Sequence, residues 1–250
     1  MRLKDKVTIV TGAASGFGEG IARLYAAEGA KVVVTDINAS GAKSVAASIG
    51  ASAIPVTCDV TKRADIDALI EATRKAFGGR IDVVVNNAGW THRNRPLLEV
   101  DEATFDKVYA INVKSIFHMI HAIVPLMRQQ KSGVILNVGS TAGIRPRPGL
   151  TWYNSSKGAV NLMSKSLAVE LGPDNIRVNA ICPVIGETGL LEEFMGMPDT
   201  PENRKKFLAT IPLGRMSRPL DVARAALYLA SDEAEFITGV EFPVDGGRTV

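Results

Sequence analysis

The chain has 250 residues, of which 46% are hydrophobic and 22% are charged, and its formal net charge is +3. This length suits one large α/β domain with a substantial core. No run of Lys or Arg resembles a nucleic-acid-binding arm, so the composition argues against a nucleic-acid partner.

The cysteines and the N-terminus bear on location. Only Cys58 and Cys182 occur, each in a strand-like stretch without CxxC spacing. A disulfide framework is therefore not expected, and a reducing compartment fits best. The N-terminus enters a short strand almost at once, and we find no apolar segment of signal-peptide length and no span long enough to cross a membrane. The sequence predicts a cytoplasmic protein without a membrane partner.

Short β-branched runs alternate along the chain with longer stretches of helical spacing. Buried runs separated by helices indicate βαβ units and a parallel sheet covered on both faces. We therefore predict one α/β domain over residues 1–250, a Rossmann-type doubly wound sheet of about seven strands. The expected strands are Val7–Val10, Val32–Thr35, Ile54–Thr57, Val83–Val85, Val134–Val138, Val178–Cys182 and Val240–Val244. The clearest expected helices are Ala64–Phe77, Phe105–Met127, Tyr153–Leu171 and Leu220–Leu229.

Directly after the first strand comes a glycine-rich stretch, Thr11–Gly18 (TGAASGFG). Glycine permits the tight turn and removes the Cβ that would hold the backbone away from a pyrophosphate. A helix starting near Gly16 points free N–H groups and its positive dipole end at the anion. Because this cluster stands between a strand and a helix, it predicts a dinucleotide-binding loop.

Asp36 ends the second expected strand, where an acid can hold the adenosine ribose hydroxyls. A carboxylate here repels a 2′-phosphate, and the loop offers Ser15, not Arg or Lys, to attract one. The sequence therefore favours NAD over NADP. The alternative role for Asp36 is to cap the next helix, which Asn38 or Ser40 can do instead.

Tyr153 and Lys157 are four residues apart on an expected helix, so their side chains share one face. A nearby ammonium and the positive nicotinamide of an oxidised cofactor favour the phenolate and lower its pKa. The phenol can then exchange a proton with an alcohol or ketone. A YxxxK pair by itself is common, and the alternative is a partly exposed helix pair.

Polar residues at strand ends support a catalytic role. Ser140 ends the fifth expected strand, at the carboxyl edge where doubly wound sheets bind ligands, and its hydroxyl can stabilise charge on a substrate oxygen. Asn86–Gly89 (NNAG) ends the fourth strand. Asn112 lies within a long helix, where a buried Asn indicates a polar network.

Together, these motifs are similar to those of the short-chain dehydrogenase/reductases. The resemblance spans essentially the whole chain and extends to Asp59-Val60, Ile176–Asn179 and Val244–Gly247. It implies that Tyr153 exchanges the proton, that Lys157 orients the cofactor and lowers the pKa of Tyr153, and that Ser140 polarises the substrate. It also implies a water held by Asn112, and a tetramer formed through the two longest helices.

The chain departs from the family pattern after the sixth strand, because Val184 follows Pro183 where the family usually has glycine. Contacts of Ile185 and Thr188 with the nicotinamide amide are still expected. No metal is expected, since His118 and His121 have no accompanying acid. The expected NAD contacts are Gly12, Ser15, Gly16, Phe17, Gly18, Asp36, Ile37, Asp59, Val60, Asn86, Ala88, Gly89, Tyr153, Lys157, Pro183, Ile185 and Thr188.

Residues 186–212 form the one stretch too long for an ordinary connection, with Phe194 among its apolar residues. An apolar insertion after a strand predicts a lid over a ligand, and the alternative is a surface helix pair that packs or forms a subunit contact.

Trp90 and Trp152 flank the catalytic motifs and are candidates to line a substrate site, although Trp152 can equally face a subunit interface. Arg145 and Arg147 suit a carboxylate or phosphate, and the alternative is solvated loop charges.

The sequence as a whole predicts an enzyme that moves hydride between a nicotinamide and a small alcohol, sugar, or hydroxy or oxo acid. One alternative is a 3-oxoacyl reductase acting on a carrier protein. The non-enzyme alternative is an NAD-sensing protein, which would have no need of all four residues Asn112, Ser140, Tyr153 and Lys157.

Overall fold

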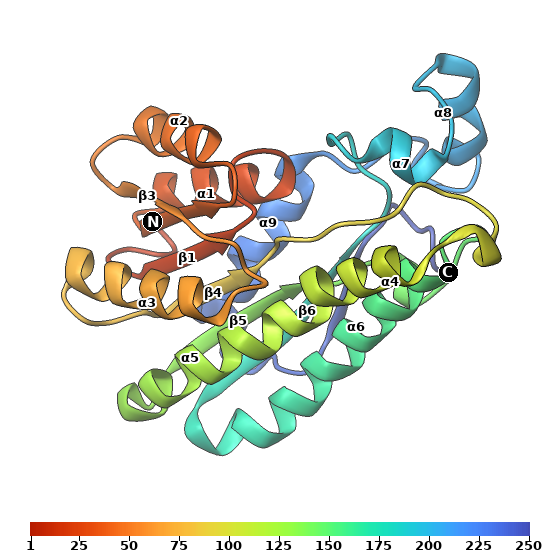
Figure 1. Cartoon of the computed structure of the whole chain (residues 1–250). Coiled ribbons are helices and arrows are strands. Elements are labelled where there is room, and N and C mark those ends of the chain that lie inside the picture. Colours follow the sequence, from red (N-terminus) through yellow and green to blue (C-terminus); the bar gives the residue numbers. More distant parts are fainter.

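The computed structural model describes residues 1–250 and contains a seven-stranded parallel sheet in the order β3-β2-β1-β4-β5-β6-β7 (Figure 1). The predicted doubly wound sheet is thereby confirmed. The strand order reverses between β1 and β4, which makes their carboxyl ends the switch point where such sheets bind ligands. The strands are β1 (Val7–Thr11), β2 (Lys31–Asp36), β3 (Ala53–Thr57), β4 (Val83–Asn86), β5 (Gly133–Val138), β6 (Ile176–Pro183) and β7 (Glu241–Val244).

Helices cover both faces of this sheet (Figure 1). They are α1 (Gly16–Ala27), α2 (Ala39–Ile49), α3 (Arg63–Phe77), α4 (Glu102–Tyr109), α5 (Ser115–Gln130), α6 (Thr151–Leu171), α7 (Leu191–Met195), α8 (Pro201–Leu208) and α9 (Pro219–Ala230). A single π-helical turn, η2 (Ala110–Lys114), joins α4 to α5.

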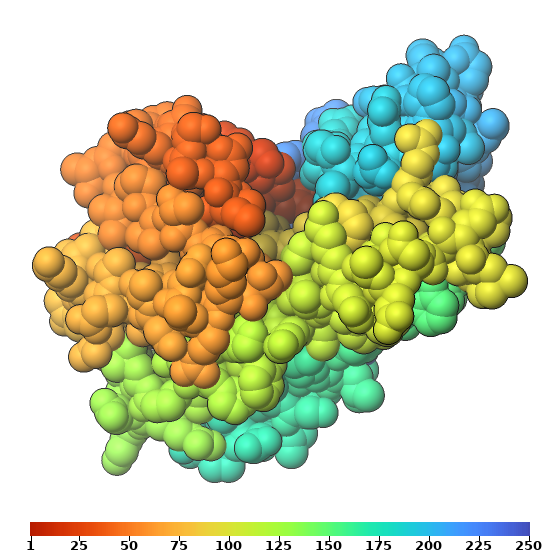
Figure 2. Space-filling view, in the orientation of Figure 1, coloured from red at the N-terminus to blue at the C-terminus, as the bar shows by residue number.

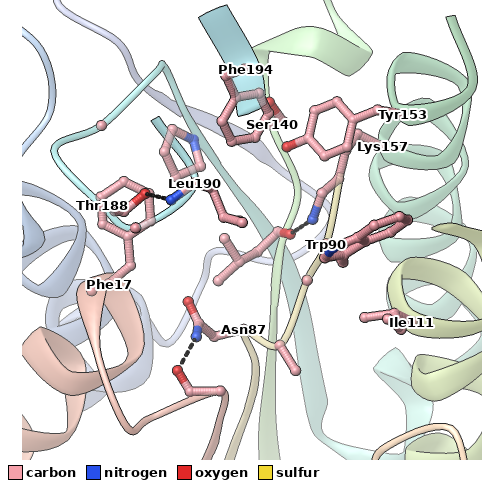
Figure 3. Close-up of a pocket in the computed structure, with 18 of the residues that line it drawn as sticks. Phe17, Asn87, Trp90, Ile111, Ser140, Tyr153, Lys157, Thr188, Leu190 and Phe194 are labelled. Atoms are coloured by element: carbon pink, nitrogen blue, oxygen red, sulfur yellow. Dashed lines mark hydrogen bonds between the residues drawn. The ribbon is translucent and has the colours of Figure 1, made fainter. Parts of the chain in front are cut away.

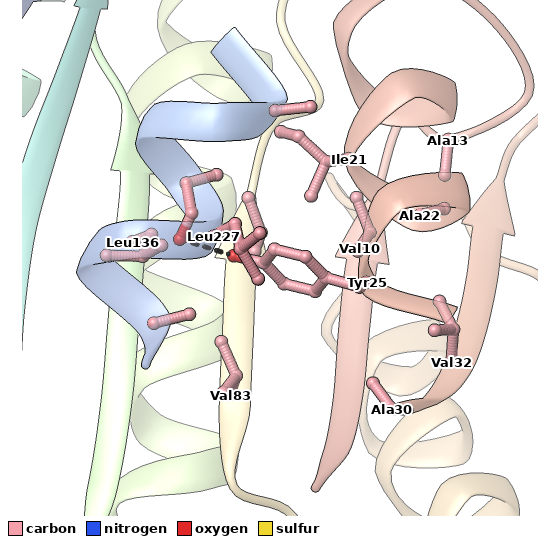
Figure 4. Packing of buried hydrophobic residues seen from close by; sticks show 14 of the residues in the cluster. Val10, Ala13, Ile21, Ala22, Tyr25, Ala30, Val32, Val83, Leu136 and Leu227 are labelled. Carbon is pink, nitrogen blue, oxygen red and sulfur yellow. Dashed lines mark hydrogen bonds between the residues drawn. The ribbon is translucent and has the colours of Figure 1, made fainter. Parts of the chain in front are cut away.

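Alternate side chains of the inner strands pack into two separate hydrophobic cores, one on each face of the sheet. Val10 and Leu136 pack with α1, α2 and α9, whereas their neighbours Ile9 and Ile135 pack with α3, α5 and α6. In the first core, Tyr25 of α1 is fully buried beside Ile21 and Leu227, and its hydroxyl donates to the carbonyl of Ala226 at 2.9 Å (Figure 4). Because side chains of a strand alternate between faces, these near-continuous apolar runs satisfy both cores.

The segment Glu102–Gln130 has the length and composition of a membrane-spanning helix, so the expectation that no span is long enough was wrong by that criterion. It packs as a core helix, however, with Met119, Ile123 and Met127 fully buried against the sheet.

The stretch predicted as a lid forms the short helices α7 and α8, which stand beyond the carboxyl end of the sheet (Figure 1). Leu191 and Met195 are buried with Met216 in a small apolar cluster of their own. This cluster attaches the segment to the loop before α9.

Candidate active site

A cavity of about 870 Å³ runs along the carboxyl ends of strands β1 to β6. In Figure 2 the surface is hollowed between the N-terminal part of the chain and the segment around residue 200. Both sides contribute to its lining, since Phe17 and Asp36 lie along it together with Phe194 and Phe207. The cavity therefore stands at the switch point of the sheet.

One end of the cavity is formed by the glycine-rich turn after β1. Gly12 and Gly16 have φ angles of +61° and +59°, a backbone conformation that side chains disfavour. Ser15 precedes α1 in an extended conformation, and its side chain makes no capping hydrogen bond. The N-terminus of α1 and the Ser15 hydroxyl are thus both available to a phosphate.

Asn87 fastens this turn to the loop after β4. Its Nδ2 donates to the carbonyls of Thr11 at 2.8 Å and Gly12 at 3.0 Å (Figure 3). A Cβ on Gly12 would lie 2.9 Å from Cα of Ala88, so only glycine allows this approach. Gly18 lies behind the turn, where a Cβ would overlap the Gly12 carbonyl oxygen.

Asn86, predicted as a cofactor contact, does not line the cavity. It is the last residue of β4, and its Nδ2 donates to Asn137 Oδ1 at 2.8 Å within the sheet. The contact of Asn86 with the cofactor therefore stays a prediction. Successive side chains alternate in direction, and the side chain of Asn87 lies on the cavity side.

Two carboxylates line the same end of the cavity. Asp36 accepts from the backbone N–H groups of Ala14 at 3.0 Å and Asn38 at 2.9 Å, which fixes its orientation beside the glycine turn. Asn38, not Asp36, caps α2 by accepting from the N–H of Gly41. The pKa of Asp59 is lowered, mainly by hydrogen bonding from Thr61.

These features fit the binding of a dinucleotide. Free N–H groups and the free Ser15 hydroxyl could hold its pyrophosphate, and the carboxylate of Asp36 could accept from its ribose hydroxyls. The lining there contains two acids and no Lys or Arg.

The other end of the cavity brings together Tyr153, Ser140 and Lys157, from α6 and the end of β5 (Figure 3). Lys157 Nζ donates to the carbonyl of Val138 at 2.7 Å and lies 5.9 Å from the centre of the Tyr153 ring. Ser140 Oγ accepts from the N–H of Ala142 at 3.0 Å, so its hydroxyl proton is free for another acceptor.

Close packing of α6 on the loop after β5 positions these groups. A Cβ on Gly143 would lie 2.7 Å from the backbone nitrogen of Gly158, and one on Gly139 would overlap Asn161. Two glycines thus bring the helix against the loop, and Tyr153 beside Ser140.

Burial sets the pKa values of the pair. It raises the pKa of Tyr153 to about 12, although the neighbouring Ser140 opposes this, and it lowers the pKa of Lys157 to about 8. Burial thus opposes the lowering of the Tyr153 pKa that the sequence predicts beside an oxidised nicotinamide, because a buried phenolate is disfavoured. With a pKa of about 12, Tyr153 is protonated at neutral pH and can donate its proton.

Asn112 lies in the π-helical turn and is buried. Its side chain accepts from the N–H of Trp90 at 2.8 Å, and donates to the Trp90 carbonyl at 2.9 Å and to Ser156 Oγ at 3.0 Å. Asn112 thus joins the loop after β4 to α6, in agreement with the expected polar network. Isolated π turns of this kind are frequent at functional sites.

Aromatic and apolar side chains surround the Tyr153 end. The ring of Phe194 meets that of Tyr153 edge-on at 5.1 Å, and Trp90 lies on the opposite side of Lys157 (Figure 3). Lys107 Nζ lies 4.2 Å from the centre of the Trp90 ring. Sequence reasoning missed Asn87, Lys107, Ile111, Leu150 and Phe207 as lining residues.

Two predicted substrate residues lie outside the cavity. Trp152 packs edge-on against Phe105 at 5.4 Å, because the position before Tyr153 on α6 points about 100° away from it. Arg145 donates to the backbone carbonyl of Arg248 at 2.8 Å. Trp90 and Arg147 do line the cavity. The other predicted residues that line it are Gly12, Ser15, Gly16, Phe17, Asp36, Ile37, Asp59, Val60, Ala88, Gly89, Ser140, Tyr153, Lys157, Pro183, Ile185 and Thr188.

Comparison with known proteins gives whole-length matches. Residues 12–249 match the family model described as Enoyl-(Acyl carrier protein) reductase. The 4-formylbenzenesulfonate dehydrogenase of Comamonas testosteroni is 50% identical over 253 residues, covering 100% of both chains. The 3-oxoacyl-(acyl-carrier-protein) reductase of Thermotoga maritima is 41% identical, again over 100% of both chains.

A solved structure is similarly close. The 3-ketoacyl-(acyl-carrier-protein) reductase of Brucella melitensis, complexed with NADH, is 44% identical, with a TM-score of 0.94 over 99% of this chain and 100% of that one.

Proposed function

The chain belongs to the short-chain dehydrogenase/reductase family and is an oxidoreductase of CH–OH and C=O groups, and from that premise we propose that it is NAD(H)-dependent and uses Tyr153 as its acid/base. One observation carries the proposal. A single cavity holds Tyr153, Ser140 and Lys157 at one end and the glycine turn with Asp36 at the other. A dinucleotide spanning the two would bring its reactive ring to the phenol.

In this proposal the phenol of Tyr153 gives its proton to the substrate carbonyl oxygen during reduction. Ser140 donates a hydrogen bond to the same oxygen and stabilises the charge that develops on it. The nicotinamide, when bound, supplies or accepts the hydride. Lys157 holds a positive charge 5.9 Å from the centre of the phenol ring and stabilises the phenolate that remains when the proton has left, while Asn112 fixes the loop that carries Trp90.

We infer a preference for NAD from Asp36, whose carboxylate would repel a 2′-phosphate. Ile37 beside it is 69% exposed and offers no positive charge. The residues expected at the nicotinamide amide, Ile185 and Thr188, both line the cavity.

We propose that residues 186–212 act as a lid, since Leu190, Phe194 and Phe207 line the cavity and Phe194 contacts Tyr153. We also propose a homotetramer in the cytoplasm. Phe117 on α5 and Leu162 and Val169 on α6 are 51%, 65% and 82% exposed, which is the kind of apolar surface that a subunit interface would bury.

Steady-state assays with Tyr153→Phe test the proposed function. NADH oxidation is measured over a panel of aromatic aldehydes, cyclic ketones and 3-oxoacyl thioesters. We expect kcat to fall by at least about 10²- to 10⁴-fold, because general acid catalysis is lost, with the Kd for NADH nearly unchanged. A variant that keeps substantial activity would contradict the role of Tyr153, and a wild-type protein that binds NADH without turnover would be a sensor.

The thioesters in the panel test the second candidate, a 3-oxoacyl reductase. Two relatives at 41% and 44% identity carry that activity in their names, and one was solved with NADH, so cofactor preference does not separate the candidates. Turnover of the thioesters with the highest kcat/KM of the panel would favour this second function.

A further inference from the structure

The charges lining the cavity are separated by sign. Its only acids are Asp36, the last residue of β2, and Asp59, two residues after β3. The cations Lys107, Arg147 and Lys157 all lie on or before the helices α4 and α6 at the Tyr153 end. Lys107 follows β4 in the chain, and Arg147 and Lys157 follow β5, so β1 lies between the strands of the acids and those of the cations. All charged residues that line the Tyr153 end, here called the substrate end, are therefore cations.

Arg147 is the cation whose surroundings identify a ligand. Its guanidinium stacks over Phe207 of α8 at 5.1 Å, and its Nη2 donates to Thr210 Oγ1 at 3.4 Å. It forms no ion pair with any carboxylate. A partly buried arginine without an acid is costly unless a ligand supplies the negative charge.

Two more arginines increase this positive potential. Burial, together with the charges of Arg248 and Arg145, lowers the pKa of Arg147 to about 10, so it remains charged at neutral pH. Arg248 is only 8% exposed, and its Nε and Nη1 have no hydrogen-bond partner in the protein. Neither Arg145 nor Arg248 pairs with an acid. None of these three neighbouring cations forms an ion pair, and the only carboxylate that favours the charged form of Arg248 is Asp245.

Apolar side chains line the cavity beside both residues: Phe207 lies against Arg147 and Phe194 against Tyr153, and Leu150 lines the same cavity. A flat ring suits such walls, and a bidentate arginine suits a carboxylate or sulfonate. We propose that Arg147 binds the anionic group of a ring-bearing substrate whose carbonyl lies at Tyr153. This inference rests on the proposed function for the position of the carbonyl, but the anion site itself does not.

Binding of a non-reactive probe tests the anion site without turnover. Benzenesulfonate and neutral benzenesulfonamide are titrated calorimetrically into the enzyme saturated with NADH, with benzoate as the carboxylate arm. We expect Arg147→Gln to weaken benzenesulfonate by about 10- to 100-fold, the worth of a charge-assisted hydrogen bond, and to leave benzenesulfonamide unchanged. The affinity of Arg147→Lys for benzenesulfonate should lie between those of the wild type and Arg147→Gln.

Arg95→Gln is the matched control, since it removes the same charge from an exposed loop residue outside the cavity. Equal affinity of the wild type for benzenesulfonate and benzenesulfonamide, or failure of the wild type to bind benzenesulfonate, would overturn the proposal. Equal weakening of both probes by Arg147→Gln would also overturn it, because Arg147 would then only hold Phe207 in place.

Turnover of matched pairs separates this inference from the proposed function. 4-Formylbenzoate should have a lower KM than its methyl ester, and Arg147→Gln should raise only the KM of the acid, with kcat little changed. If the enzyme reduces neither of these two compounds and no other carbonyl compound of the panel, the proposed function fails. The calorimetry still shows in that case whether Arg147 binds the anion.

Discussion

The two ends of the cavity are constructed differently. The end beside the glycine turn and Asp36, here called the cofactor end, is lined by backbone and by short motifs at the ends of β1, β2 and β4. Gly12 and Asn87 determine the shape of the turn there. The substrate end is lined by side chains on α4, α6, α7 and α8, which are far apart in the sequence. The first is determined by local conformation, and the second by how whole helices pack.

Charge follows the same division. Carboxylates occupy the cofactor end and unpaired cations the substrate end, so one cavity presents opposite potentials to the two parts of a reacting complex. Changing the charge at one end should therefore leave ligand binding at the other end unaffected.

Among the changes that test this division of charge, reversal at the cofactor end should give the largest effect. In Asp36→Asn with Ile37→Arg, the carboxylate is removed and a guanidinium is placed at an exposed position beside it. We expect the ratio of kcat/KM for NADPH to that for NADH to rise about 100-fold, since repulsion is replaced by charge-assisted bonds. Steady-state kinetics with both cofactors measure the ratio, and Ile37→Gln is the uncharged control. An unchanged ratio would remove Asp36 as the selector.

The sheet was predictable because its signal is local. All seven apolar runs are strands within a few residues of the expected bounds, since buried parallel strands need continuous β-branched residues. The glycine turn was predictable for a similar reason, as its positive φ angles restrict the residue type at Gly12 and Gly16. The π-helical turn η2, which divides the predicted helix Phe105–Met127, had no comparable signal in the sequence.

The substrate end was less predictable because rotation of a helix and alternation of a strand decide which side chain faces inward. Of two adjacent asparagines, Asn87 and not Asn86 lines the cavity, and of the two tryptophans only Trp90 does. Lys107 and Phe207 line the cavity only because of where α4 and α8 pack, which the sequence pattern does not show. The raised pKa of Tyr153 was missed because it follows from the depth of burial.

The substrate end should also respond to pH. Because the pKa of Lys157 is lowered to about 8 and that of Tyr153 is raised to about 12, Lys157 is charged below pH 8 while Tyr153 stays protonated across pH 6 to 10. Carbonyl reduction should therefore be level below pH 8 and fall about tenfold per pH unit above it, as the charge that supports the departing proton is lost. A pH profile of kcat measures this, and Lys157→Arg should abolish the fall. A level profile up to pH 10 would show that the charge of Lys157 does not limit the reduction.

The smallest effect should come from the packing behind the glycine turn. In Gly18→Ala the new methyl group overlaps the Gly12 carbonyl and lies close to Asn87, so α1 must move away from the turn. We expect a loss of about 1–3 kcal/mol in the free energy of unfolding, as for overpacking in general, and weaker binding of NADH because the helix N-terminus moves away from the phosphate.

Gly172→Ala is the matched control, since a Cβ there meets nothing within 4 Å and the residue precedes β6 at the opposite edge of the sheet. Denaturant unfolding and fluorescence titration with NADH measure the two quantities, and binding of benzenesulfonate should not change. If Gly18→Ala weakened that probe as much as it weakened NADH, the two ends of the cavity would be mechanically coupled, and the division between them would hold for charge alone.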